Sequence, residues 1–186
     1  MKNSIPNWQP SQLEDDVVKL IPLTADDFEN LFAAASDPLI WEQHPSKDRY
    51  KRDVFQLFFD GAVSSGTAFL ITDKASGKII GSTRYYDYKP GQSSIAIGFT
   101  FLVKEKWGGL YNKSAKRLLL DYAFQYVDNV YFHIGPDNIR SQRGTMKTGA
   151  KKVNEVELDN NGQKQLHYEY LIQKKEWNSI SSIKSF

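Results

Sequence analysis

The residues best suited to bind a ligand are two consecutive glycines, Gly108 and Gly109, within the segment WGGLYN at residues 107–112. Alternating apolar residues before this segment predict a half-buried strand, and apolar residues at spacings of three and four after it predict an amphipathic helix. Glycine permits positive φ and close approach of a ligand, while a helix N-terminus offers unpaired N–H groups. The flanking stretch 104–117 is rich in Lys and Arg. The pattern predicts a phosphate-binding turn; the alternative is an ordinary turn before a solvated basic helix face.

Two known phosphate-binding patterns do not fit this turn. A P-loop requires G-x-x-x-x-G-K-[ST], but Lys113 and Ser114 follow Gly109 at the wrong spacing, with no second glycine directly before them. The dinucleotide fingerprint G-x-G-x-x-G is also absent, as is an acidic residue placed to bind the ribose. We therefore expect a phosphorylated ligand that is neither a Walker-type nucleotide nor NAD.

A second segment, GPDNIRSQRGTMKTGA at residues 135–150, follows a short apolar strand VYFHI. Gly135 and Pro136 end that strand, and Asp137 or Asn138 can cap a helix that ends near Gly149. This region is a second strand-to-helix junction, similar in kind to the one at the glycine pair.

Four segments together resemble the GNAT superfamily of acyl-CoA N-acyltransferases: IGFTFLV, KEKWGGLYN, KSAKRLLLDYAF and NIRSQRGTMKTGA. The resemblance covers about residues 16–173 and is greatest to the branch that includes ribosomal-protein N-terminal acetyltransferases. It implies a single-domain α/β (α+β) fold. The expected sheet is mixed and mostly antiparallel, with helices on both faces and one splayed pair of parallel strands that end near Val103 and Gly135.

The resemblance also implies where acetyl-CoA binds as co-substrate. The backbone N–H near Leu102 is the expected donor to the thioester carbonyl. Candidate partners of the phosphates, each otherwise an ordinary surface charge, are Lys106, Lys113, Lys116, Arg140 and Arg143. The expected coenzyme-binding residues are Phe101, Leu102, Val103, Trp107, Gly108, Gly109, Leu110, Tyr111, Asn112, Lys113, Asn138 and Ser141.

The resemblance assigns the catalytic acid less directly. Many members have a tyrosine that protonates the leaving thiolate, and this chain has Thr145 at that position. Asn138 and Ser141 match the N-x-x-S pattern of the ribosomal-type branch, so Ser141 is the candidate acid and Asn138 its positioning residue. A serine in the first helical turn is otherwise a capping residue, and water could deliver the proton instead. Two further departures are Glu105, at the Gln/Arg position of the family's loop, and Leu110, at its second glycine.

The base that removes a proton from the amine has several candidates. Glu42 and His44, beside Trp41, lie where the resemblance places the acceptor. Asp87 is their main rival, His133 is expected to be a packed core histidine, and water is a further alternative. A group of aromatic residues could line an acceptor pocket or belong to the core: Trp41, Tyr50, Phe58, Tyr85, Tyr86 and Tyr88.

Hydrophobic periodicity completes the expected organisation. Gly98, in the middle of a predicted strand, predicts a bulge, a close approach or a packing site. Residues 1–14 form a polar lead-in, residues 15–175 the acyltransferase domain, and residues 176–186 a polar tail expected to fray. Strands are expected near residues 17–23, 67–72, 79–88, 95–103, 130–134, 151–158 and 164–172, and helices near residues 25–35, 49–62, 113–126 and 138–149.

Composition limits the classes of function. The net charge is +2, there is no cysteine, and the three histidines lack metal-ligand spacing. No signal peptide or membrane-length apolar run is present in the sequence. We expect a cytoplasmic protein without a metal, a membrane or a nucleic acid as partner; a homodimer stays open.

These observations predict an N-acetyltransferase that moves an acetyl group from acetyl-CoA to a primary amine by direct transfer, since no cysteine nucleophile exists. The acceptor is a small-molecule or peptide amine. The alternative is a non-catalytic acyl-CoA-binding or sensing domain, which the departures at Glu105, Leu110 and Thr145 keep open.

Overall fold

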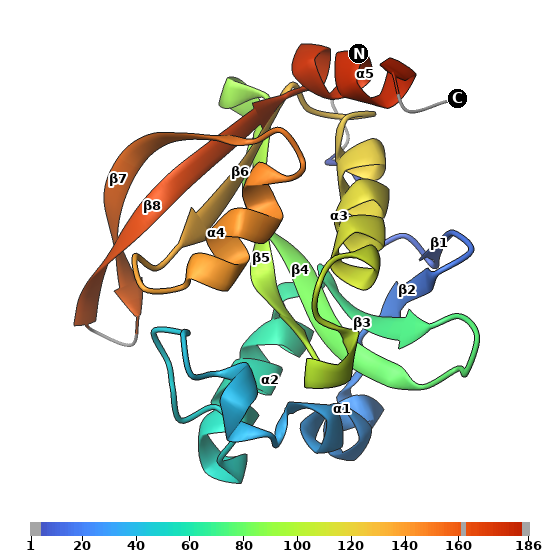
Figure 1. The fold of residues 1–186 in the computed structure, drawn as a ribbon, viewed down its shortest axis with the longest axis vertical. Helices are drawn as coiled ribbons and strands as arrows, with labels where there is room; N and C mark the ends of the chain where they lie inside the picture. Colours follow the sequence, from blue (N-terminus) through green and yellow to red (C-terminus); the bar gives the residue numbers. More distant parts are fainter. Residues whose placement is uncertain (1–4, 161–162, 184–186) are drawn as a thin grey trace.

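The computed structural model describes residues 5–160 and 163–183, which form one eight-stranded mixed sheet with helices around it (Figure 1). The strand order is β1-β2-β3-β4-β5-β6-β8-β7, and only the β5–β6 pair is parallel. The predicted fold class is confirmed. The strands are β1 (Leu13–Glu14), β2 (Val18–Pro22), β3 (Ala68–Asp73), β4 (Ile79–Lys89), β5 (Ser94–Leu102), β6 (Asn129–Ile134), β7 (Lys151–Asn160) and β8 (Gln163–Gln173).

Local sequence signals explain where the helices begin and end. Thr24 and Asp27 form a capping box ahead of α1, in which the Thr24 N–H donates to the Asp27 carboxylate at 2.8 Å. Gly66 ends α2 in the left-handed region, at a φ of 60°. The helices are α1 (Phe28–Ala35), α2 (Arg52–Ser65), α3 (Leu110–Ala123), α4 (Ile139–Met146) and α5 (Lys174–Ile183).

Strands β5 and β6 pair over a short stretch and then part. The parallel ladder joins Ser94–Ala96 of β5 to Asn129–Tyr131 of β6, and it stops there although both strands continue. From Ile97 onward, β5 keeps β4 as its neighbour but has no strand on its other side. The splayed parallel pair expected from the sequence is therefore present.

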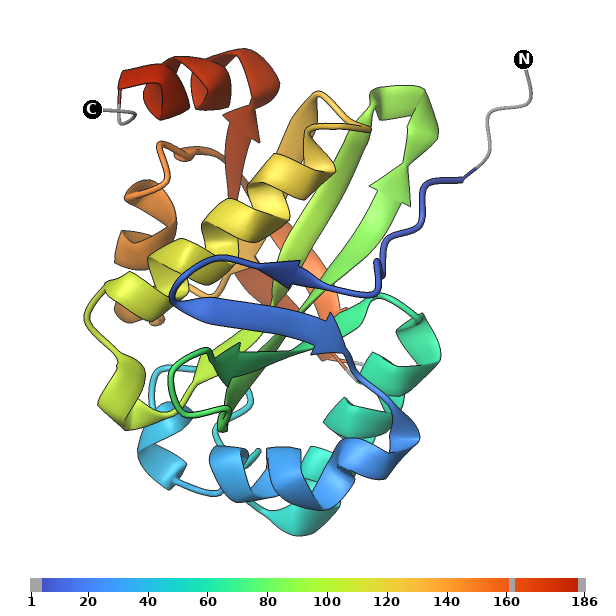
Figure 2. The same cartoon turned by 90° about the vertical axis from the view of Figure 1, so that its right-hand side faces the viewer.

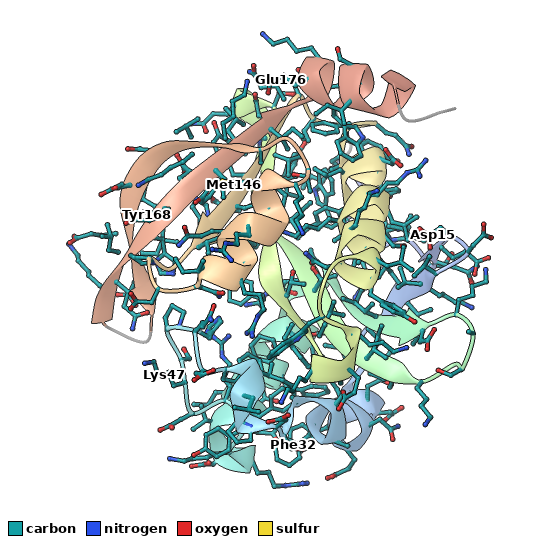
Figure 3. All side chains as sticks on the ribbon, viewed as in Figure 1. Asp15, Phe32, Lys47, Met146, Tyr168 and Glu176 are labelled. Carbon is teal, nitrogen blue, oxygen red and sulfur yellow. The ribbon has the colours of Figure 1, made fainter. Side chains whose placement is uncertain are left out.

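The helices cover both faces of the sheet, as predicted. Alternate residues of β3 point into different cores: Phe69 and Ile71 join one, Ala68 and Leu70 the other. The first core is covered by α3, which runs obliquely across the strands in Figure 2. The second is covered by the aromatic helices α1 and α2, which lie at the lower end of Figure 1 and include Phe32, labelled in Figure 3.

Both ends of the described chain pack more closely than the sequence predicted. Trp8, in the expected polar lead-in, is 5% exposed and packs against Tyr85 and Tyr88, with ring centroids 5.2 and 5.1 Å away. The expected frayed tail forms α5, whose buried Trp177 donates to the Asp121 carboxylate at 2.7 Å. In each segment one tryptophan among polar residues supplies enough apolar area to hold it in place. Residues 1–4, 161–162 and 184–186, which the sequence assigned to the lead-in, a loop and the tail, lie outside the described residues.

In the described part of the chain, no helix combines the length and the apolar character that crossing a membrane requires.

Trp8→Ala should lower the free energy of unfolding by ~3 kcal/mol, because it removes a large buried ring from the first core. Ile5→Ala, three residues earlier and 78% exposed, is the control and should change little. Urea unfolding of both variants measures the difference. Equal effects below about 1 kcal/mol would show that the lead-in does not stabilise the domain.

Candidate functional site

A cavity of about 720 Å³ lies where β5 and β6 part. Its walls come from both strands, from the turn that contains Gly108 and Gly109, from α3 and α4, and from residues 40–45. Figure 1 shows α3 and α4 on this part of the sheet, beyond the end of the short β5–β6 ladder. The cavity therefore joins the two strand-to-helix junctions that the sequence singled out.

The turn at one end of the cavity needs its two glycines for conformational reasons. Gly108 has a φ of 97° and Gly109 a φ of 144°, which side chains rarely adopt. A Cβ at either position would meet no atom within 4 Å, so backbone strain is the constraint there. The first intrahelical bond of α3 runs from the Lys113 N–H to the Gly109 carbonyl at 2.9 Å. The N–H groups before Lys113 therefore have no partner within the helix and can bind a ligand.

The cavity brings together nine of the residues expected to bind the coenzyme and leaves out three. Leu110 is 62% exposed and points away, and the Tyr111 hydroxyl accepts from the Lys106 ammonium at 2.7 Å. Val103 also lies outside the lining. The departures at Leu110 and Glu105 therefore fall on residues that do not line the cavity. The nine lining residues are Phe101, Leu102, Trp107, Gly108, Gly109, Asn112, Lys113, Asn138 and Ser141.

Two of the five candidate phosphate partners are engaged elsewhere in the protein. Lys106 pairs with Asp73 at 2.9 Å and does not line the cavity. Arg140 lies over the Trp107 ring at 3.7 Å and donates to the Ile40 carbonyl at 2.9 Å. Arg140 thus joins α4 to the glycine turn and to the segment before α2. Arg140 still lines the cavity, as do the other candidates, Lys113, Lys116 and Arg143.

The main chain of β5 presents a donor to the cavity. The Val103 N–H donates to the Ile80 carbonyl of β4 at 2.8 Å. Because successive N–H groups of a strand point to alternate sides, the Leu102 N–H points away from β4, toward the side without a strand. The Leu102 carbonyl accepts from the Trp107 indole N–H at 2.8 Å, which fixes this end of the strand against the glycine turn.

At the second junction, Asn138 is the N-cap of α4. Its side-chain oxygen accepts from the Ser141 N–H at 3.1 Å, as expected for a cap. Ser141 lines the cavity, and Thr145, one turn later on the same face of α4, lines it too. Asn138 therefore orients the helical turn that presents Ser141.

Lys116 is a buried cation that the sequence did not distinguish from surface charges. It is 5% exposed, its ammonium donates to the Thr145 hydroxyl, and it lies 4.7 Å from the centroid of the Phe132 ring. Burial lowers the pKa of Lys116 to about 7. The signal was its position on the apolar face of the helix, three and four residues before Leu119 and Leu120.

His133 is part of a hydrogen-bonded chain rather than only a packed core histidine. Its Nδ1 lies 2.7 Å from the Tyr86 hydroxyl and its Nε2 lies 2.9 Å from Glu169. Tyr86 reaches from β4 across β5 because Gly98 leaves room: a Cβ there would lie 2.8 Å from the Tyr86 ring. The neighbouring Phe99, at a φ of 52°, forms a bulge opposite β4. The glycine thus permits a close approach, and the bulge lies beside it.

The base candidates of the sequence lie in different surroundings. His44 lines the cavity, its Nδ1 accepts from the Ser46 N–H at 2.9 Å, and its Nε2 lies 3.1 Å from the Arg49 guanidinium. Burial, then the nearby Arg49, lowers the pKa of His44 to about 3. Glu42 is exposed and outside the lining, and Asp87 pairs with Lys89 at 2.8 Å.

Among the six aromatic candidates, Trp41 alone lines the cavity. Phe58 and Tyr85 belong to the two cores and Tyr86 to the hydrogen-bonded chain. Within residues 5–160 and 163–183 there is no group of three or more side chains that could hold a metal ion.

Comparison with known proteins agrees with this geometry. The family model described as an acetyltransferase (GNAT) domain matches residues 18–151. Among solved structures, a GCN5-related N-acetyltransferase from Brucella melitensis has a TM-score of 0.80 at 21% identity, covering 98% of this chain and 88% of the other. RimJ from Mycobacterium smegmatis, solved with CoA-disulfide, has a TM-score of 0.65 at 17% identity, covering 89% and 87%. A candidate ribosomal-protein-serine acetyltransferase from Vibrio cholerae has a TM-score of 0.69 at 15% identity, covering 89% and 99%. No curated protein matches significantly in sequence.

His44 should make the protein less stable as the pH falls. Its folded pKa lies below the ordinary value, so between pH 6.5 and about 3 the unfolded chain binds a proton that the folded protein does not. The free energy of unfolding therefore decreases across this window. Between pH 7.5 and 4.5, His44→Gln should lose ~2 kcal/mol less free energy of unfolding than the parent, because glutamine does not bind a proton in the unfolded chain. Urea titrations at both pH values measure the difference.

His167, which is half-buried and also lines the cavity, is a lesser cause of the lowered pKa of His44, so His167→Gln should reduce the loss much less than His44→Gln does. An identical loss of stability in the parent and in His44→Gln would contradict the burial of His44 as a neutral ring.

Proposed function

This chain belongs to the GNAT acetyltransferase family, and we propose that it transfers an acetyl group directly from acetyl-CoA to a primary amine. The observation that supports this most strongly is the cavity at the parting of β5 and β6. One end of it has a glycine turn and a helix N-terminus, and the other end has titratable side chains. Direct transfer is consistent with a sequence that contains no cysteine.

The coenzyme would enter along the parting strands. Its pyrophosphate would lie at the Gly108–Gly109 turn and the start of α3, where N–H groups and the helix dipole favour anions. Lys113 and Arg143 line the same cavity and would neutralise phosphate charge. The pantetheine arm would take the place of the missing strand beside β5. The Leu102 N–H would donate to an amide carbonyl of the arm rather than to the thioester oxygen, because the sulfur would lie near the end of the β5–β6 ladder, about five residues along the strand.

Ser141 is the proposed hydrogen-bond donor to the sulfur atom as the thioester breaks. Its place in the cavity wall and its cap by Asn138 support this role. Asn138 does not itself need to touch the reacting atoms, since it fixes the first turn of α4. In this scheme Asn138 is a positioning residue.

His133 is the best-supported base for the amine, ahead of His44 and Glu42. It lines the cavity, and both of its ring nitrogens have partners. The amine proton would therefore reach it through the Tyr86 hydroxyl, which passes its own proton to Nδ1 while Glu169 stabilises the charged ring. His44, by contrast, faces donors at both ring nitrogens, although a neutral imidazole can accept at only one. Glu42 would have to move into the cavity to act.

The acceptor is a primary amine of a small molecule or a peptide. Of the described residues that line the cavity, several are Lys, Arg or His and none is Asp or Glu. A neutral attacking amine suits such surroundings better than a polycation, because like charges raise the cost of binding.

Acetyl-CoA or CoA should raise the melting temperature with ligand concentration, because a ligand that binds only the folded state stabilises it. Gly108→Val should weaken binding by about tenfold or more, since its φ of 97° strains any side chain and displaces the backbone donors. Lys113→Ala should cost only a few-fold, because an exposed cation is replaceable. Calorimetry on the parent and both variants measures these affinities.

Gly91→Val, in a turn where a Cβ would meet no atom within 4 Å, controls for general effects of a valine. The coenzyme assignment would be abandoned if the parent showed neither binding heat nor a thermal shift with millimolar CoA.

His133→Gln should remove the acidic limb of the pH profile of kcat/KM, because the group that accepts the amine proton is lost. Tyr86→Phe and Glu169→Gln should weaken the same limb, while Asp87→Asn should leave it unchanged. The profiles of Glu42→Gln and His44→Gln test the rival candidates in the same assay. A limb that survives in His133→Gln but disappears in one of these two would transfer the role to that residue.

A parent protein that binds CoA tightly but acetylates no member of a broad amine panel would favour the sensing domain over the enzyme.

A further inference from the structure

The ammonium group of Lys116 lies at the apex of the parting strands. The last pair of the parallel ladder joins Ala96 to Tyr131, and Phe132 is the next residue of β6. The Lys116 ammonium lies 4.7 Å from the centroid of the Phe132 ring, and both residues line the cavity. Because the free space between the strands narrows to this point, a pantetheine arm that starts at the glycine turn directs its sulfur toward it.

The two sides of β6 at this apex carry different chemistry. Phe132 belongs to the core under α3, where Lys116 lies, and His133, the next residue, points to the opposite face. The thioester would thus have the Lys116 ammonium on one side and the His133 ring on the other. A transfer reaction needs a proton source for the sulfur and a proton acceptor for the amine, and the sheet keeps the two apart.

Lys116 also occupies space that a larger residue on α4 would fill. Thr145, its hydrogen-bond partner, stands where many family members have the tyrosine that protonates the thiolate. The short threonine leaves room for a lysine to reach across from α3. Ser141 lies one turn before Thr145, so both hydroxyls and the ammonium face the same part of the cavity.

We propose that Lys116 is the proton donor to the coenzyme A thiolate, an inference that rests on the proposed acetyl transfer. The amine nitrogen attacks the thioester carbon, an N–C bond forms, and the C–S bond breaks with its electron pair on sulfur. Sulfur takes a proton from the Lys116 ammonium. The amine gives a proton to the Tyr86 hydroxyl, which passes its own proton to Nδ1 of His133. Solvent then reprotonates Lys116 and deprotonates His133, which leaves an acetamide and a free thiol.

The surroundings suit this exchange. Besides Lys116, the charged residues of α3 and α4 that line the cavity are all cations: Lys113, Arg117, Arg140 and Arg143. Lys147, directly after α4, is a further cation of the lining. None of the described residues that line the cavity is Asp or Glu, and burial lowers the pKa of Lys116 to about 7. An ammonium with a pKa near neutrality gives its proton readily to a thiolate, because the conjugate thiol is the weaker acid: a cysteine thiol, for example, has an ordinary pKa of about 8.5. Ser141 would only donate a hydrogen bond to the sulfur, whereas Lys116 would transfer the proton that converts the thiolate into the thiol.

The test compares Lys116→Met with the parent in single-turnover thiol release across pH 6–10. The methionine keeps the length and the packing of the stem but cannot give a proton. We expect kcat to fall about 100-fold, the Kd of CoA to stay within about threefold, and the basic limb of kcat to disappear. Lys78→Met, in an exposed turn, is the matched control. A variant that keeps kcat within about twofold and retains the basic limb would overturn the proposal.

Two further measurements keep the test decisive. If Lys116→Met does not fold, the near-isosteric Thr145→Val removes the hydrogen bond that favours the ammonium, so the basic limb should move to lower pH; an unmoved limb would overturn the proposal. If Lys116→Met folds, its melting temperature should rise relative to that of the parent as the pH falls from 10 to 7. In this range Lys116 binds a proton in the unfolded parent but not in the folded parent, which destabilises the parent alone. No such growth would show that Lys116 is not the buried titrating group. A parent that releases no thiol with any amine disproves the transfer itself, whereas an active parent with an unaffected variant disproves only the role of Lys116.

Discussion

The organising constraint of this structure is the unpaired main chain where β5 and β6 part. Buried backbone N–H and C=O groups need partners, and a parallel ladder that stops after three residue pairs leaves such groups along both strands. The protein satisfies part of this need itself, as when the Trp107 indole donates to the Leu102 carbonyl. The remainder is a strand-shaped vacancy bordered by a helix N-terminus. An extended ligand with amide groups and phosphates at one end matches that shape and polarity, and the pantetheine arm of coenzyme A is such a ligand.

In the proposed reaction, the same parting would separate the two proton transfers of the acyl transfer. Consecutive residues of β6 point to opposite faces, so Phe132 faces Lys116 under α3 while His133 faces Tyr86 and Glu169. Gly98 is essential to this arrangement because only a residue without Cβ lets the Tyr86 ring cross β5. The bulge at Phe99, next to Gly98, interrupts the ladder with β4 and bends β5. Two irregularities of β5, the glycine and the bulge, thus help to shape the cavity and to position the Tyr86 side chain near it.

The sequence predicted the parts of this design that depend on local patterns. Alternation predicted the strand before the glycine pair, and spacings of three and four predicted α3. Asp137 or Asn138 was expected to cap α4, and Asn138 does. Each of these signals lies within one helical turn or one strand. The parting of the strands followed from the resemblance and was confirmed. The environments of Lys116 and His133 could not be predicted, because their partners Thr145, Tyr86 and Glu169 come from other elements. The hydrogen bond from Arg140 to the Ile40 carbonyl could not be predicted for the same reason, since its partner is distant in the sequence.

A structure of the protein with bound CoA tests the account most directly. It should show the pyrophosphate at the Gly108–Gly109 turn, the pantetheine beside β5, and the sulfur within hydrogen-bonding reach of Ser141 and Lys116. CoA bound elsewhere, or with its sulfur far from the apex of the parting strands, would contradict the account.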